Sequence, residues 1–142
     1  MNSKQENQKQ LKFAYSKLLG NISPICKSIT INTLDGKSIT VFANILMKLS
    51  NYFKNVIGYN SDQVTLDYSF DIVTKMIEIL HNCELDDIEL SNEDFNSLLN
   101  LGDFIDSPYL TIFLYFVHCK DNQIIEKECE INVLLTFAKQ FS

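Results

Sequence analysis

The stretch VFANILMKLSNYFKNVI, from Val41 to Ile57, carries the strongest structural signal in the chain. Its apolar residues recur at helical spacing on both sides of Ser50-Asn51, and these two polar residues interrupt the run. Asn44 is of a type that caps helix amino termini, so we expect it to cap the first helix. Gly58 is expected to end the second. The stretch therefore predicts two short helices, and the apolar residues after Ser50 are expected to be core rather than a binding site.

The residues before this stretch predict a β-hairpin and a helix. The segment ITINTLDGKSITV, residues 29–41, places β-branched residues on both sides of Asp35-Gly36. Asp-Gly readily adopts the positive φ values of a tight hairpin turn. Four residues are expected to share its buried face: Ile29, Ile31, Ile39 and Val41. Nearer the amino terminus, an amphipathic helix over 11–19 is expected to end at Gly20.

The residues after the stretch predict a short strand followed by four helices. The strand is expected over Val64 to Leu66. Three of the helices are expected to begin after the capping residues Ser69, Ser91 and Ser107. A last helix is expected from about Asn122. The predicted fold class is α+β, with a small β-sheet covered by a cluster of α-helices.

Length and composition indicate one intracellular domain. The chain has 142 residues, of which 46% are hydrophobic, which is enough for one core. No apolar run approaches the length of a membrane span, and the polar start MNSKQENQKQ lacks the apolar region of a secretory signal. We therefore expect a soluble protein of the cytoplasm or nucleus that has no membrane partner.

The charges argue against nucleic-acid binding and divide unevenly along the chain. All 12 basic residues are lysine, and the net charge is −6. Residues 1–54 contain eight lysines and two acids, whereas residues 55–142 contain four lysines and 16 acids. From Asp62 to Asp106 there are 12 acids and one lysine. This acidic band is either a solvated face or a surface for a lysine-rich partner. The candidate partner-binding residues are Tyr59, Glu84, Asp86, Asp87 and Glu89.

Chemistry-bearing residues give little support for catalysis or metal binding. The pairs His81-x-Cys83 and His118-Cys119 could be considered for a zinc site, which needs four converging ligands, but they are expected on helices whose apolar stripes already use Cys83. There is no glycine-rich phosphate loop, and no spacing that pairs a cysteine with a base. We expect no catalytic residue, no metal and no cofactor, and hence no enzyme.

The ordered set of motifs resembles that of BTB/POZ domains. Ile45-Leu46 and the run Ser50-Asn51-Tyr52-Phe53 match the family's I/V-L pair and its S-x-Y-F motif. Residues 64–66 look like the strand that follows, and residues 70–85 resemble the next helix. Residues 98–110, with Gly102-Asp103-Phe104 and Pro108-Tyr109-Leu110, look like the segment written A-D-x-L-x-x-P-x-L. The resemblance covers about residues 25–119.

The resemblance implies a domain organisation and a class of function. It divides the chain into a polar segment and amphipathic helix (1–23), a BTB/POZ-like core (24–119) and a helical extension (120–142). The implied function is a non-enzymatic interaction module that forms a homodimer. We expect its first helix to pack on the partner chain through four candidate interface residues: Leu11, Phe13, Ala14 and Leu18.

The same resemblance leaves an alternative function open. Some members recruit a cullin as substrate adaptors of ubiquitin ligases, through a hydrophobic-x-Glu motif after the S-x-Y-F helix. Here Ile57-Gly58-Tyr59 lacks the Glu. The alternative is therefore a cullin-binding adaptor, or a viral decoy of that pathway acting in a host cell. A composition rich in Asn, Ile and Lys without Arg or Trp is typical of an AT-rich genome, such as that of a large DNA virus.

Overall fold

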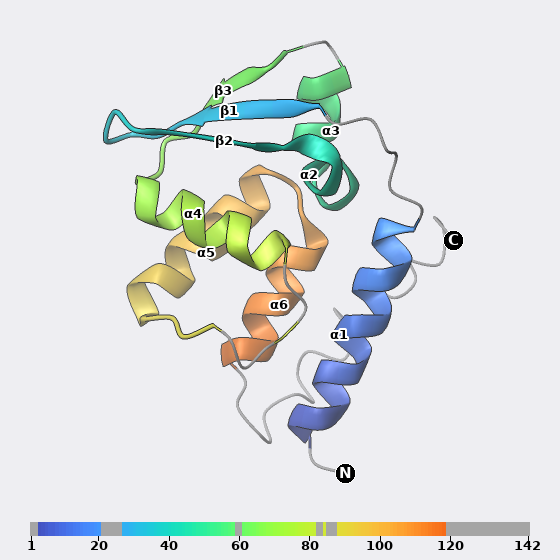
Figure 1. The fold of residues 1–142 in the computed structure, drawn as a ribbon. Coiled ribbons are helices and arrows are strands. Elements are labelled where there is room, and N and C mark those ends of the chain that lie inside the picture. Colours follow the sequence, from blue (N-terminus) through green and yellow to red (C-terminus); the bar gives the residue numbers. More distant parts are fainter. Residues whose placement is uncertain (1–2, 21–26, 59–60, 82–83, 85–87, 119–142) are drawn as a thin grey trace.

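The computed structural model describes residues 3–20, 27–58, 61–81, 84 and 88–118. These ranges form a mixed fold of helices and one small sheet, so the expected α+β class is confirmed (Figure 1). The elements are α1 (Ser3–Leu19), β1 (Ser28–Asn32), β2 (Ser38–Phe42), α2 (Ala43–Leu49), α3 (Asn51–Gly58), β3 (Gln63–Thr65), α4 (Phe70–Leu80), α5 (Asn92–Phe104) and α6 (Pro108–His118). The helix expected from Asn122 lies outside the described residues.

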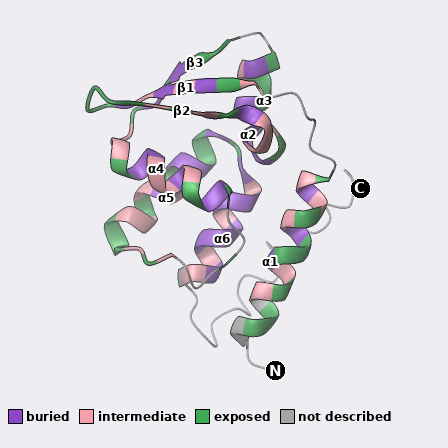
Figure 2. Ribbon diagram, in the orientation of Figure 1, coloured by how far each residue is buried: buried purple, intermediate pink, exposed green. Residues whose placement is uncertain are grey.

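The three strands form a sheet in the order β2-β1-β3. β1 and β2 are antiparallel with Ile29 opposite Val41 and Ile31 opposite Ile39, which confirms the predicted hairpin. β3 lies parallel to β1 on its other side. Ile29 and Ile31 are fully buried, whereas Ile39 and Val41 are half-buried because β2 is an edge strand. Figure 2 shows the buried residues gathered on β1 and on the helices beneath the sheet.

The hairpin turn is wider than the two-residue turn expected at Asp35-Gly36. The loop runs from Thr33 to Lys37, and the Thr33 N–H donates to the Lys37 carbonyl at 2.8 Å. Gly36 has a φ of +77°, but Asp35 keeps a negative φ. The Asp35 carboxylate instead accepts hydrogen bonds from the Thr33 hydroxyl at 2.6 Å and from the Phe70 N–H at 3.0 Å. The turn is therefore shaped by its contact with the start of α4.

These hydrogen bonds make the stability contributed by Asp35 depend on pH. The bond from Thr33, followed by the bond from Phe70, lowers the pKa of Asp35 below its ordinary value against an opposing effect of desolvation. The folded state therefore binds the proton more weakly than the unfolded state. The stabilisation is complete above the ordinary carboxyl pKa and is lost as the pH falls through the lowered folded-state pKa.

We expect Asp35→Asn to reduce the free energy of unfolding near neutral pH, with the difference from wild type shrinking below about pH 4. Urea denaturation at a series of pH values measures this difference. Asp103→Asn, at an exposed carboxylate on α5, is the control and should leave the wild-type pH profile in place. A difference between Asp35→Asn and wild type that stays constant over the acid range would contradict this account.

Three predicted serine caps are confirmed. The Ser69 hydroxyl accepts from the Ile72 N–H at 3.3 Å and starts α4. The hydroxyls of Ser91 and Ser107 accept backbone N–H groups three residues ahead, at 3.1 and 3.2 Å, and start α5 and α6. Each satisfies a helix N–H that has no partner within the helix.

The cap predicted at Asn44 is wrong. Helix α2 begins at Ala43, directly after β2, and the residue at its cap position is Phe42. The Ala43 N–H donates to the carbonyl of Lys27 at 2.7 Å. A first-turn donor of α2 is thus satisfied by the backbone that leads into β1, so no side-chain cap is needed there.

The break between α2 and α3 is confirmed at Ser50, which is buried and linked to the end of α5. The Ser50 hydroxyl donates to the Ile105 carbonyl at 2.6 Å and accepts from the Phe53 N–H at 3.2 Å. The Asn51 N–H and side-chain amide bond to the carbonyl and carboxylate of Asp106 at 3.2 and 2.8 Å. The start of α3 is therefore attached to a segment 55 residues further along the chain.

Ser50→Ala is expected to lower the free energy of unfolding by about 1 to 3 kcal/mol, because it removes a helix cap and a buried tie between two helices. Chemical denaturation measures the change. Ser16→Ala, at an exposed position on α1, is the control and should fall within about 0.5 kcal/mol of wild type. Equal stabilities of the two variants would show that the Ser50 hydroxyl does not support the junction.

Candidate protein-interaction surfaces

Helix α1 packs on its own chain through three of the four residues predicted for the dimer interface. Leu11, Ala14 and Leu18 are 0%, 1% and 5% exposed and belong to the same hydrophobic core as α2 and α6. The Tyr15 ring lies 5.0 Å from that of Tyr109, and its hydroxyl donates to the Leu80 carbonyl at 3.2 Å. Burial of apolar surface within one chain competes directly with burial against a partner. These three residues are core, and the boundary expected after residue 23 does not separate α1 from the core.

Phe13 alone of the four predicted interface residues is exposed. Its side chain is 44% exposed on the solvent side of α1, and the Lys17 amine lies 5.7 Å from the ring centroid. Aromatic side chains are enriched at protein–protein interfaces relative to the rest of the surface. Phe13 therefore stays a candidate contact for a second copy of the chain.

The predicted acidic partner site is described only in part. Tyr59, Asp86 and Asp87 lie outside the described residues. Glu89 is exposed, and Glu84 is exposed and forms a salt bridge of 3.0 Å with Lys12 on α1. Each partner of this bridge is about half exposed, so the bridge contributes about 0 to 1 kcal/mol. It joins the lysine-rich and acid-rich parts of the sequence within one chain.

Two further acids of the band pair with Lys75, and one of these pairs joins two helices. The Lys75 amine on α4 lies 2.6 Å from the Asp71 carboxylate and 2.9 Å from the Asp94 carboxylate on α5. Hydrogen bonds to Asp71 and then to Asp94 raise the pKa of Lys75. The single lysine of the band is therefore used to pair α4 with α5, and these two carboxylates serve the fold.

An aromatic pair, with Phe104 exposed and Tyr52 partly buried, lies where α3 meets the end of α5. The rings of Tyr52 and Phe104 are 5.1 Å apart, and Phe104 is 54% exposed. Tyr52 also packs edge-on against the buried Phe53 at 5.4 Å. The pairing joins residues 52 positions apart, so no local pattern predicts it. The only sequence signal was the presence of both aromatics in the two BTB/POZ-like motifs.

The ranges that the structure describes contain no group of three or more His, Cys, Asp or Glu side chains arranged to hold a metal ion. The His81 ring nitrogen Nδ1 lies 2.8 Å from the Ile77 carbonyl at the end of α4. Within the same ranges, no helix has both the length and the apolar character needed to cross a bilayer. Cys83 and Cys119 lie outside the described residues.

Comparison of the sequence with protein-family models and with curated proteins gives no match. Any assignment of function therefore depends on the arrangement of the residues themselves.

Proposed function

We propose that the protein is a non-enzymatic interaction module that forms a homodimer through a BTB/POZ-like fold. The observation that carries this proposal is the position of the Ser50-Asn51-Tyr52-Phe53 motif. Its serine joins α2 to α3, its phenylalanine enters the core, and its tyrosine meets the exposed Phe104. The elements around it follow the order that the resemblance implies: hairpin, two short helices, a third strand and further helices.

The exposed ring on α1 indicates one place where two copies could meet. Phe13 projects from a helix whose opposite side is fixed in the core by Leu11, Ala14 and Leu18. A rigid helix presenting an aromatic ring loses little conformational entropy on association. We place the dimer contact on this outer side of α1, with the core residues acting as its support.

Sedimentation velocity tests the dimer. We expect the wild-type chain to sediment as a dimer and Phe13→Glu to shift it toward the monomer, because a carboxylate would be desolvated at the contact. Ser16→Glu, an exposed position on the same helix, is the control and should remain dimeric. A wild-type chain that stays monomeric at high concentration would overturn the proposal. A Phe13→Glu variant that stays as dimeric as Ser16→Glu would move the contact away from α1.

A second candidate function, binding of a cullin, is favoured by the Tyr52–Phe104 pair. Tyr52 lies on α3, the helix that precedes the residues where cullin-binding members of the resembled family carry their recruitment motif, and Phe104 lies at the end of α5. Its exposed ring area is of the kind that supplies binding energy at protein interfaces. Calorimetric titration with a purified cullin amino-terminal domain tests this function. Binding that is lost in Phe104→Ala and kept in Leu34→Ala would support it, and no heat of binding with wild type would exclude it.

A further inference from the structure

Within the described residues, the β2 side of the sheet ends in a row of backbone groups that have no strand neighbour. Two hydrogen bonds show which residue pairs of the β1–β2 ladder are hydrogen-bonded: the Thr33 N–H donates to the Lys37 carbonyl, and the Ala43 N–H donates to the Lys27 carbonyl. In an antiparallel ladder, alternate residues bond to the neighbouring strand, here through the pairs Ile29–Val41 and Ile31–Ile39. The remaining residues of β2 direct their N–H and C=O groups away from β1. They are Ser38, Thr40 and Phe42, and all three side chains are exposed.

The β3 side of the sheet ends in a similar row. The Thr30 N–H donates to Asp62 and the Leu66 N–H donates to Asn32, each at 2.9 Å. In this hydrogen-bond pattern, the backbone groups of Val64 point toward β1 and bond to it. Gln63 and Thr65 direct their backbone groups outward, and their side chains are exposed. In the described part of the chain, β2 and β3 each have β1 as their single strand neighbour.

Neither edge strand contains the charged residue or proline that often blocks pairing, and β3 is three residues long. Proteins commonly place lysine, proline or a bulge on an edge strand. The strands SITVF and QVT contain no charged residue and no proline. Phe42 is moreover 64% exposed on a sheet face that otherwise carries small polar side chains. Both edges are therefore able to accept another strand.

The charges beside the two edges are opposite in sign. Lys37, directly before β2, is exposed with its amine 5.4 Å from the Phe70 ring centroid, and the carboxylate of Asp35 in the same turn is held by hydrogen bonds from Thr33 and Phe70. Asp62 precedes β3 and Asp67 follows it by two residues, and both are exposed. Pairing of β3 with β3 of another copy would bring carboxylates together, whereas pairing of β2 with β3 would bring Lys37 toward a carboxylate.

We propose that copies of this chain associate head to tail, with β2 of one copy pairing with β3 of the next. β2 runs antiparallel to β1, and β3 runs parallel to it. If the next copy continues the sheet in the same orientation, its β3 therefore runs antiparallel to β2 of the first copy. Ser38 then lies opposite Thr65 or Asp67 of the next copy, and in both registers Lys37 is within two residues of that Asp67. Each added copy leaves one edge of each kind free, so the assembly is open-ended. It is separate from the α1 contact of the proposed dimer.

Sedimentation velocity over about two decades of concentration tests this assembly. At low salt, we expect the average mass of wild type to rise beyond the dimer without a plateau, and to fall as salt is raised from about 0.05 to about 0.5 M. Lys37→Glu alone and Asp67→Lys alone should each lower the association constant of the assembly about fivefold to tenfold, because each substitution brings like charges together. Both variants should keep the dimer made through α1.

Charge exchange separates pairing from damage to the fold. An equal mixture of Lys37→Glu and Asp67→Lys, or the double variant, should recover growth of the assembly, since an acid and a lysine then lie near each other at every junction. Thr40→Pro removes an outward N–H of β2 and no backbone bond to β1, so it should stop growth of the assembly. Thr40→Val loses the same hydroxyl bond to Thr30 but keeps the N–H, so it should keep growth. A mass that levels off at the dimer in wild type, or a mixture that does not recover growth, would overturn the proposal.

Discussion

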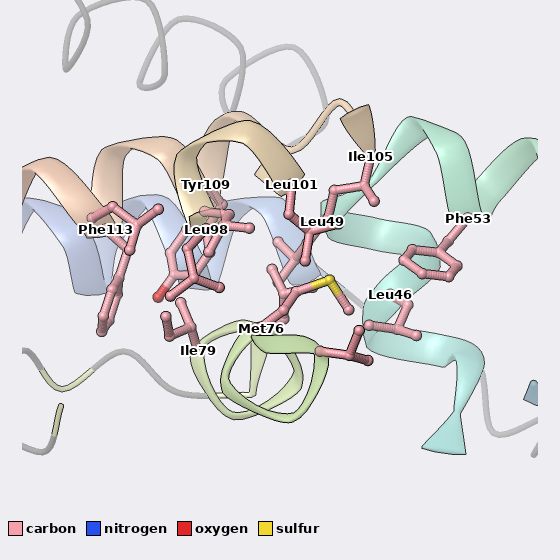
Figure 3. Packing of buried hydrophobic residues seen from close by; sticks show 14 of the residues in the cluster. Leu46, Leu49, Phe53, Met76, Ile79, Leu98, Leu101, Ile105, Tyr109 and Phe113 are labelled. Carbon is pink, nitrogen blue, oxygen red and sulfur yellow. The ribbon is translucent and has the colours of Figure 1, made fainter. Parts of the chain in front are cut away.

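Replacing Phe53 by alanine is expected to lower the free energy of unfolding by about 3 to 5 kcal/mol. The side chain is 0% exposed and lies in the core beside Leu46 (Figure 3). Its ring also packs edge-on against Tyr52, and its N–H donates to the Ser50 hydroxyl. Truncation therefore removes buried apolar area and leaves a cavity at the point where α3 joins the core. Urea denaturation followed by circular dichroism measures the change.

Phe104→Ala is the matched control for this prediction. Phe104 is the other aromatic packed around Tyr52, but more than half of its surface is in solvent. Its truncation should cost less than about 1 kcal/mol, since little area is lost and no closed cavity forms. If the two variants were equally stable, or if Phe53→Ala lost only the binding of a partner, the S-x-Y-F segment would not have the structural role assigned to it.

Leu11→Ala is expected to cost about 2 to 5 kcal/mol, and the loss should be independent of protein concentration. Leu11 is fully buried within its own chain, so the cavity forms whether or not a second copy is bound. A residue at a dimer contact would instead give a stability that rises with concentration through mass action. Thermal denaturation at concentrations that differ about a hundredfold distinguishes the two cases.

Lys9→Ala, at an exposed position on the same helix, is the control and should unfold within about 0.5 kcal/mol of wild type. A Leu11→Ala variant that loses stability only at low concentration would return α1 to the interface that the sequence predicted. Together with Phe13→Glu, this variant separates the two sides of α1: one holds the core, and the other is proposed to meet a second copy.

The two proposed contacts use different parts of the molecule. The outer side of α1 would form a closed dimer, whereas the edges of the sheet would form an open chain. The sheet-edge contact uses Asp67 of the acidic band. Other acids of the band are paired within the chain, where Lys75 joins Asp71 to Asp94 and Lys12 pairs with Glu84. The uneven charge along the sequence is thus partly balanced inside the fold.

Local signals were sufficient for most elements of this fold. The serine caps at Ser69, Ser91 and Ser107, the helix break at Ser50 and the existence of the hairpin all follow from residues within a few positions of one another. The physics of caps, turns and apolar spacing acts over this range, so it can be recognised without knowing the rest of the chain. The BTB/POZ-like motifs were recognised from the same short segments.

Contacts between distant segments were decided only by the tertiary structure. The sequence showed that α1 has an apolar stripe but not which chain covers it, because such a stripe is stabilised equally by any apolar surface. The width of the hairpin turn depends on a hydrogen bond from Phe70 to Asp35, and the start of α2 depends on the carbonyl of Lys27. The sheet edges and the Tyr52–Phe104 pair likewise arise from packing between elements. Residue spacing along the chain does not predict these contacts, since they depend on how all the elements of the core pack together.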